Sequence, residues 1–218
     1  MGKPLRIVVL LSGSGSTLEN IFAHIAERDL PASVIHVISS RHDAYGLVRA
    51  RQHGVPTSVV ASRDFRHRDA TGNLVPNWKA MSDAITRIIL PLAPDLVCLA
   101  GFMCKYLLPP SLEGKTMNIH PALIPSFCGH GMYGMRVHEA VVKAGVKITG
   151  CTVHFATNEY DAGPIILQRA CPVYDTDTPE DVQRRVFREE CEAYPDAIRL
   201  YAEGRLRIDG NIVRVRRD

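Results

Sequence analysis

The chain has 218 residues, of which 46% are hydrophobic and 22% are charged, and its formal net charge is +3. A chain of this length can bury a core without metal or disulfide staples, and its charges form no basic block of the kind that binds nucleic acid. No apolar run reaches the ~18 to 20 residues of a membrane span, and residues 1–11 lack a cleavable apolar segment with a small-residue cleavage site. We therefore expect a cytoplasmic protein that binds neither nucleic acid nor membrane.

The cysteines and histidines show no spacing typical of a metal site. No C-x-x-C pair, H-x-x-x-H motif or mixed Cys/His spacing typical of a zinc site occurs. Several cysteines lie in apolar runs such as LVCLAGF, where a free thiol behaves as a small hydrophobic group. We predict that no metal is bound and that six thiols stay reduced: Cys98, Cys104, Cys128, Cys151, Cys171 and Cys191.

The amino-terminal half alternates between apolar runs and helical patterns. Residues 5–11, 32–39, 57–60 and 96–101 read as strands, and residues 18–27, 46–54 and 77–92 have apolar residues at helical spacing. Strands that are apolar along their whole length are covered on both faces of a sheet. The expected fold is therefore α/β and Rossmann-like, with a mainly parallel twisted sheet and helices on both faces.

The carboxyl-terminal half is more irregular. A short strand, TMNIH, enters a proline-bracketed loop, and a glycine-rich segment precedes a short helix at 136–145. Two strands at 147–155 and 164–173 lead to a long helix at 179–203 that begins with a capping sequence, and a tail hairpin turns at 209–211. We expect a single domain over 1–218, made of a phosphate-binding half at 5–107, a catalytic half at 108–206 and a basic tail at 207–218.

The SGSGST segment between the first strand and the first helix can bind an anion, since backbone N–H groups and the helix dipole would face it. The segment lacks the third glycine of a dinucleotide fingerprint and the Gly-Lys-Ser/Thr ending of a Walker loop. A monophosphate therefore fits better than NAD or ATP. The alternative is a tight turn that needs glycines for its shape alone.

Asn118 and His120 flank Ile119 on a strand, so their side chains point to the same face. Pro121 ends this strand and leaves both residues at its carboxyl end, where open α/β sheets bind ligands. An amide and an imidazolium can both stabilise the oxyanion of an acyl-transfer intermediate. The alternative is that the histidine is structural.

Two carboxylates complete the candidate site. Asp161 lies in the turn-rich loop NEYDAGP, and if it reaches His120 its charge should raise the pKa of the imidazole and keep a proton donor available near neutral pH. Glu190 falls on the apolar stripe of the last helix, formed by Val182, Val186, Ala193 and Ala197. A carboxylate in that position needs a partner, which is either an internal arginine or an amine or hydroxyl of a substrate.

The motifs SGSGST, LAGFM and NIHPALIPSF, followed by GCTVHF and YDAGPIILQ, resemble the phosphoribosylglycinamide formyltransferase family over about residues 5–206. The resemblance implies transfer of a formyl group from the co-substrate 10-formyltetrahydrofolate to glycinamide ribonucleotide. We expect a monomer or homodimer, and the sequence does not decide between them. It matches Asn118, His120 and Asp161 to the catalytic residues, with Asn118 and protonated His120 stabilising the oxyanion.

The same resemblance implies the binding residues. Gly15, Ser16 and Thr17 would hold the phosphate and Glu190 would contact the ribonucleotide, whereas the folate would be bordered by Arg68, Met103, Asn118, Thr157, Asn158, Glu159, Tyr160 and Asp161. The chain departs from the family pattern at Thr17, at Cys104 and Lys105, and at Phe187.

Three other functions remain open. Methionyl-tRNA formyltransferase shares the Asn and His pair but usually has an additional carboxyl-terminal domain, and formyltetrahydrofolate hydrolase shares the trio but normally carries a regulatory domain in front. A noncatalytic nucleotide-binding module would explain the glycine loop, but it would not explain Asn118, His120 and Asp161 together.

Overall fold

A computed structural model describes residues 3–27 and 29–216. The chain forms two compact units, and each is described by itself. The first contains the residues up to Ala23 together with Ala32–Thr116, and the second contains His24–Pro31 together with the residues from Met117 onward.

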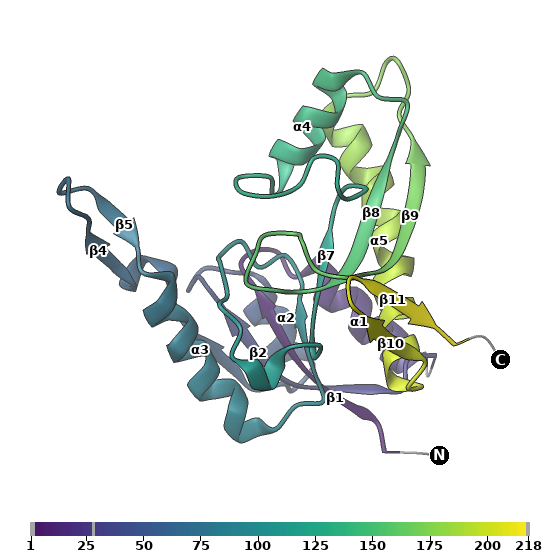
Figure 1. Cartoon of the computed structure of the whole chain (residues 1–218). Coiled ribbons are helices and arrows are strands. Elements are labelled where there is room, and N and C mark those ends of the chain that lie inside the picture. Colours follow the sequence, from purple (N-terminus) through teal and green to yellow (C-terminus); the bar gives the residue numbers. More distant parts are fainter. Residues whose placement is uncertain (1–2, 28, 217–218) are drawn as a thin grey trace. The chain divides into compact units, whose positions relative to one another are not determined.

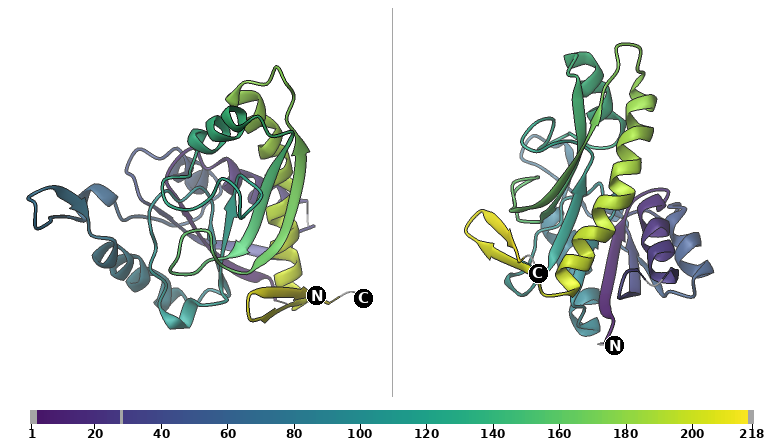
Figure 2. Two further views of the ribbon diagram at one scale, coloured as in Figure 1. Left: turned by 45° about the horizontal axis from the view of Figure 1, so that its top comes forward. Right: turned by 90° about the vertical axis from the view of Figure 1, so that its right-hand side faces the viewer.

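The first unit is built on four parallel strands in the order β3-β2-β1-β6 (Figure 1). These are β1 (Leu5–Leu11), β2 (Ala32–Ser39), β3 (Thr57–Val59) and β6 (Leu96–Leu99). The connecting helices are α1 (Ser16–Ala26), α2 (Gly46–Gln52) and α3 (Trp78–Leu92). Right-handed crossovers place α1 and α2 on one face and α3 on the other, because the chain reverses direction along the sheet after β3 (Figure 2). The predicted α/β class is confirmed, with strands close to the predicted ranges.

A hairpin of β4 (Arg66–Arg68) and β5 (Leu74–Pro76) precedes α3 and was not predicted. Its strands are three residues long, and all three residues of β4 are exposed. Such a segment has no apolar alternation from which a strand could be recognised. Two short 3₁₀ helices, Ser62–Asp64 and Pro110–Leu112, were also not predicted.

The second unit contains β7 (Thr116–His120) from Met117 onward, together with β8 (Ile148–Phe155) and β9 (Ile165–Pro172), and these strands pair antiparallel in that order. The link between β8 and β9 is too short for a parallel crossover. The predicted tail hairpin is confirmed as β10 (Leu206–Asp209) and β11 (Ile212–Val215), and β11 adjoins β9 in parallel orientation. The predicted parallel sheet therefore describes the first unit, whereas most pairings in the second are antiparallel.

Helix α5 (Pro179–Ala202) lies along one face of β8 and β9 (Figure 2). It starts within the predicted capping sequence, Asp177–Glu180, but the cap itself is formed by Thr178 and Asp181, which bond reciprocally. Its stripe Val182, Val186, Ala193 and Ala197 is buried, and the hydroxyl of Tyr194 donates to the carbonyl of Met117. A shorter helix, α4 (Met135–Ala144), packs against α5.

The part of the chain that the structure describes contains no helix that is both long and apolar enough to cross a membrane. All six cysteines are free thiols, as predicted.

Candidate active site

The site begins on β7, which carries Asn118 and His120. In the antiparallel register Asn118 lies opposite His154 and His120 lies opposite Thr152, so four polar side chains share one face of β7 and β8. Cys151 alternates with Thr152 and points to the other face, toward α5. Burial raises the pKa of its thiol, and the charge of Glu190 raises it further. The polar cluster therefore occupies the face that α5 leaves uncovered.

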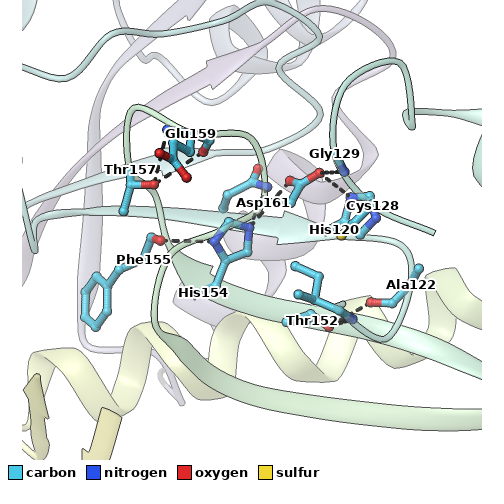
Figure 3. Close-up of polar contacts among 12 residues, drawn as sticks. His120, Ala122, Cys128, Gly129, Thr152, His154, Phe155, Thr157, Glu159 and Asp161 are labelled. Atoms are coloured by element: carbon cyan, nitrogen blue, oxygen red, sulfur yellow. Dashed lines mark hydrogen bonds and ion pairs between the residues drawn. The ribbon is translucent and has the colours of Figure 1, made fainter. Parts of the chain in front are cut away.

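Asp161 reaches this cluster from the loop between β8 and β9 (Figure 3). Its backbone has a φ of 51° and its side chain is 11% exposed. One carboxylate oxygen, Oδ2, accepts from the backbone N–H of Gly129 at 2.8 Å and lies 3.7 Å from Nδ1 of His120. The other, Oδ1, lies 3.7 Å from Nε2 of His154. The structure thus brings together the three residues predicted to be catalytic and adds a second histidine.

His154 is the residue that sequence reasoning missed. It is 2% exposed, and its Nδ1 donates to the carbonyl of Phe155 at 3.0 Å, because a carbonyl can only accept. In the neutral ring Nε2 is then an acceptor, and it lies 3.1 Å from the amide nitrogen of Asn118, whereas in the protonated ring Nε2 carries a proton beside Oδ1 of Asp161. This contact fixes which way the Asn118 amide points. The alternation of Thr152 and His154 in GCTVHF repeats that of Asn118 and His120, and this signal was overlooked.

Two opposing effects act on the pKa of His120. Burial lowers the pKa of the imidazole below its ordinary value of 6.5, and the charge of His154 lowers it further. The charge of Asp161 acts in the predicted direction, raising the pKa, but desolvation outweighs it. Asp161 therefore acts on His120 in the predicted direction, but the net shift is downward, and the ring without substrate is mainly neutral at pH 7.

The position of the proton on neutral His120 follows from its contacts. Nε2 donates to the carbonyl of Phe127 at 2.9 Å, so Nδ1 holds a lone pair on the side of Asp161. Although burial raises the pKa of Asp161, its contacts with His154, His120 and Gly129 outweigh this and lower the pKa overall. An ionised carboxylate therefore lies beside the one ring nitrogen that can take up a proton.

Replacing Asp161 by Asn is expected to lower the pKa of His120 further, because it removes the negative charge that favours the imidazolium. An NMR titration of the histidine ring protons measures this directly. Glu159→Gln, which changes an exposed carboxylate in the same loop, is the control and should leave the titration unchanged. An unaltered His120 titration in Asp161→Asn would remove the electrostatic role of Asp161.

The glycine loop in the first unit has the backbone shape that its sequence predicts. Gly15 has a φ of 73°, and a Cβ atom there would lie 2.6 Å from Cα of Gly46, so no larger residue fits. Helix α1 begins at the next residue, Ser16, which leaves the N–H groups of its first turn without partners within the helix. Arg49, which the sequence analysis did not single out, donates to the carbonyl of Ser14 and to Glu19. These features are compatible with an anion at the loop.

The residues predicted to border folate lie on three loops or short elements. Met103 is 51% exposed and its N–H donates to Ser12, and Arg68 lies on β4 and donates to the carbonyl of Gly72. In the second unit, residues 157–160 are exposed, and the Tyr160 ring contacts the ring of His130 edge to face, with centroids 5.6 Å apart.

Glu190 is not joined to the polar cluster. It lies on α5, on the opposite face of β8, and desolvation raises the pKa of its carboxyl to about 7. Within residues 3–27 and 29–216 it makes no hydrogen bond or ion pair. The nearby Arg169 pairs instead with Asp196 and Glu189. The sequence left open whether an internal arginine pairs with Glu190. Among the described residues no arginine does.

One group of described side chains, His24, Glu27 and Asp29, has ligand atoms close enough together to hold a metal ion. Asp29 is already bonded to His24 at 2.6 Å and to Arg199 at 3.3 Å, and the two carboxylates are exposed. This arrangement is an ordinary surface ion-pair network.

Comparison with known proteins gives consistent matches. The family model described as formyl transferase matches residues 5–198. The phosphoribosylglycinamide formyltransferase of Haemophilus influenzae is 38% identical over 210 residues, which cover 95% of this chain and 92% of that protein. The structure of glycinamide ribonucleotide transformylase 1 from Symbiobacterium toebii aligns with a TM-score of 0.84 at 42% identity, covering 99% of this chain and 95% of that one. A formyltetrahydrofolate deformylase from Pseudomonas syringae aligns with a TM-score of 0.81 at 25% identity, over 98% of this chain and 66% of that one.

Proposed function

The chain belongs to the formyl transferase family, and from this premise we propose that it transfers a formyl group from 10-formyltetrahydrofolate to the amine of N1-(5-phosphoribosyl)glycinamide. This reaction is a step of de novo purine (IMP) biosynthesis. The observation that carries the proposal is the cluster of Asn118, His120 and Asp161 at the carboxyl end of β7. A noncatalytic binding module would not require this combination of an amide, an imidazole and a carboxylate.

The chemistry follows from the arrangement of the cluster. The substrate amine attacks the formyl carbon, and the formyl oxygen becomes negative as a tetrahedral intermediate forms. The Asn118 amide, oriented by His154, donates a hydrogen bond to this oxygen. Neutral His120 takes up a proton at Nδ1, and Asp161 stabilises the imidazolium that results.

The intermediate then collapses with loss of the folate amine. The bond between the formyl carbon and N10 of the folate breaks, the amine that attacked loses a proton, and N10 gains one through His120 and water. No covalent bond to the protein forms. The net result is formylated ribonucleotide and tetrahydrofolate.

The substrate contacts are proposed from the matched motifs and from the local structure. The phosphate binds at Gly15, Ser16 and Thr17, where the glycine loop meets the start of α1. Glu190, whose carboxyl has no partner among the described residues, receives an amine or hydroxyl of the ribonucleotide. The folate is bordered by Arg68, Met103 and residues 157–161. We place the reaction in the cytoplasm, in keeping with the free thiols, and in a monomer or homodimer.

A spectrophotometric assay with wild-type protein and a 10-formylfolate donor tests the proposal. Folate release is measured with glycinamide ribonucleotide, with methionyl-tRNA and with no acceptor. Release that requires the ribonucleotide supports the proposal. Release without acceptor would identify a hydrolase, release that requires methionyl-tRNA would identify the other formyltransferase, and binding of ribonucleotide without release would identify a binding module.

A further inference from the structure

The segment that follows β7, residues 121–129, contacts both His120 and Asp161 through its backbone. The carbonyl of Phe127 accepts from Nε2 of His120, and the N–H of Gly129 donates to Asp161. The placement of this segment therefore determines the proton position on His120 and the position of the Asp161 carboxylate. Phe127 has a φ of 50°, a strained value for a residue with a side chain, so its surroundings must hold it there.

The start of this segment, residues 122–124, is held by one hydroxyl on β8 (Figure 3). Thr152, which is fully buried, donates to the carbonyl of Ala122 at 2.7 Å and accepts from the N–H of Ile124 at 3.0 Å. It also accepts from the Gln168 amide at 2.9 Å. A hydroxyl has one donor and two acceptor positions, so all three are used.

Gln168 extends this contact from the neighbouring strand. In the register of β8 and β9 it lies opposite Thr152, and its amide nitrogen also donates to the carbonyl of Ile124 at 3.0 Å. The backbone of residues 122–124 is thus tied to two adjacent strands by three hydrogen bonds. The fourth bond, between Thr152 and Gln168, fixes the two side chains relative to each other.

We propose that Thr152, supported by Gln168, is a positioning residue that sets the geometry of His120 through the backbone of residues 122–127. It touches no reacting atom in the proposed reaction. Its hydroxyl fixes the start of the segment, the segment carries the Phe127 carbonyl, and that carbonyl holds His120 with Nδ1 unprotonated and facing Asp161. The kinetic part of this inference rests on the proposed function, but the effect on the His120 ring does not.

Thr152→Val tests the inference, because it keeps the shape of the side chain and removes the hydroxyl. The carbonyl of Ala122 and the N–H of Ile124 then lose their partner, and the segment should shift or loosen. We expect kcat for formyl transfer to fall by about tenfold or more while KM for the ribonucleotide changes by less than about threefold. We also expect the His120 titration to shift from its wild-type position, because the segment both shields the ring from water, which lowers the pKa, and carries the Phe127 carbonyl, whose hydrogen bond raises it.

The chain supplies a matched control on the same strand. Thr149 is 2% exposed and its hydroxyl has no hydrogen-bond partner among the described residues, so Thr149→Val makes the same chemical change without breaking a bond seen in the structure. It should leave kcat and the His120 titration as in the wild type. Thr152→Ser keeps the hydroxyl and should restore both to near wild-type values.

A milder variant guards against loss of the fold. Gln168 is exposed, so Gln168→Leu removes its bonds to Ile124 and Thr152 with little risk to the core. It should change kcat and the His120 titration in the same directions as Thr152→Val, by a smaller factor. Folded Thr152→Val and Gln168→Leu proteins with wild-type kcat and wild-type His120 titration would overturn the inference. If the wild type transfers no formyl group, the proposed function fails, and the titrations alone then decide the positioning role.

Discussion

Replacing His120 by Ala is expected to lower kcat for formyl transfer by about 10³-fold, the range lost when a positioned acid or base is removed. The imidazole is the group that takes up a proton beside Asp161, and Asn118 alone cannot supply the balancing positive charge. KM for the ribonucleotide should change much less, since the proposed phosphate and Glu190 contacts remain. Steady-state kinetics with both substrates varied measure the two parameters separately.

The control for this substitution is His67→Ala, which removes an exposed histidine of β4 and should leave kcat unchanged. The pH dependence provides a second check in the wild type. Because His120 acts from its neutral form and its pKa is lowered from 6.5, kcat/KM should fall on the acid side only below pH 6.5. Turnover by His120→Ala within a few-fold of the wild type would show that the imidazole has no part in the chemistry.

Replacing Glu190 by Gln is expected to stabilise the fold while weakening substrate binding. The pKa of this carboxyl is raised from 4.5 to about 7, so the folded state holds the proton more tightly than the unfolded state. The stability that comes from the protonated form is complete below pH 4.5 and is lost as pH rises through about 7. At pH 8 the ionised, desolvated carboxylate lowers the free energy of unfolding by up to about 3 kcal/mol. A neutral Gln side chain avoids this loss.

Urea unfolding at two pH values measures this effect. The free energy of unfolding of Glu190→Gln should exceed that of the wild type by up to about 3 kcal/mol at pH 8, and the two should converge near pH 4.5. Glu189→Gln changes the adjacent carboxylate, which faces Arg169 at 4.0 Å, and should alter stability by less than about 1 kcal/mol. Equal stability of Glu190→Gln and wild type at pH 8 would show that the carboxyl is better solvated than its position suggests.

The kinetic effect of the same variant tests the proposed contact with substrate. Loss of a hydrogen bond to a charged group costs about 1.5–3 kcal/mol, so KM for the ribonucleotide should rise by about 10- to 100-fold. A stabilised variant with an unchanged KM would mean that Glu190 serves another purpose. The stability gain and the binding loss are independent readouts, so one can fail without the other.

The local features of this protein were predictable from its sequence because they depend on neighbouring residues. The apolar runs gave the parallel strands of the first unit, and the capping sequence gave the start of α5. The two-residue period of a strand placed Asn118 and His120 on one face, as the structure shows. Their catalytic roles, like the binding roles of Glu190 and the folate residues, remain predictions that the experiments above test.

Tertiary structure decided what depends on distant residues. The register of β7 against β8 pairs Asn118 with His154, and the fold of the segment after β7 gives Nε2 of His120 its acceptor. The depressed pKa of His120 and the raised pKa of Glu190 both come from burial, which is a property of the packed chain and not of the local sequence. The sequence by itself determined which chemical groups are present and which strand face they share. The fold alone decided their partners and charges, because register and desolvation are set by residues far apart along the chain.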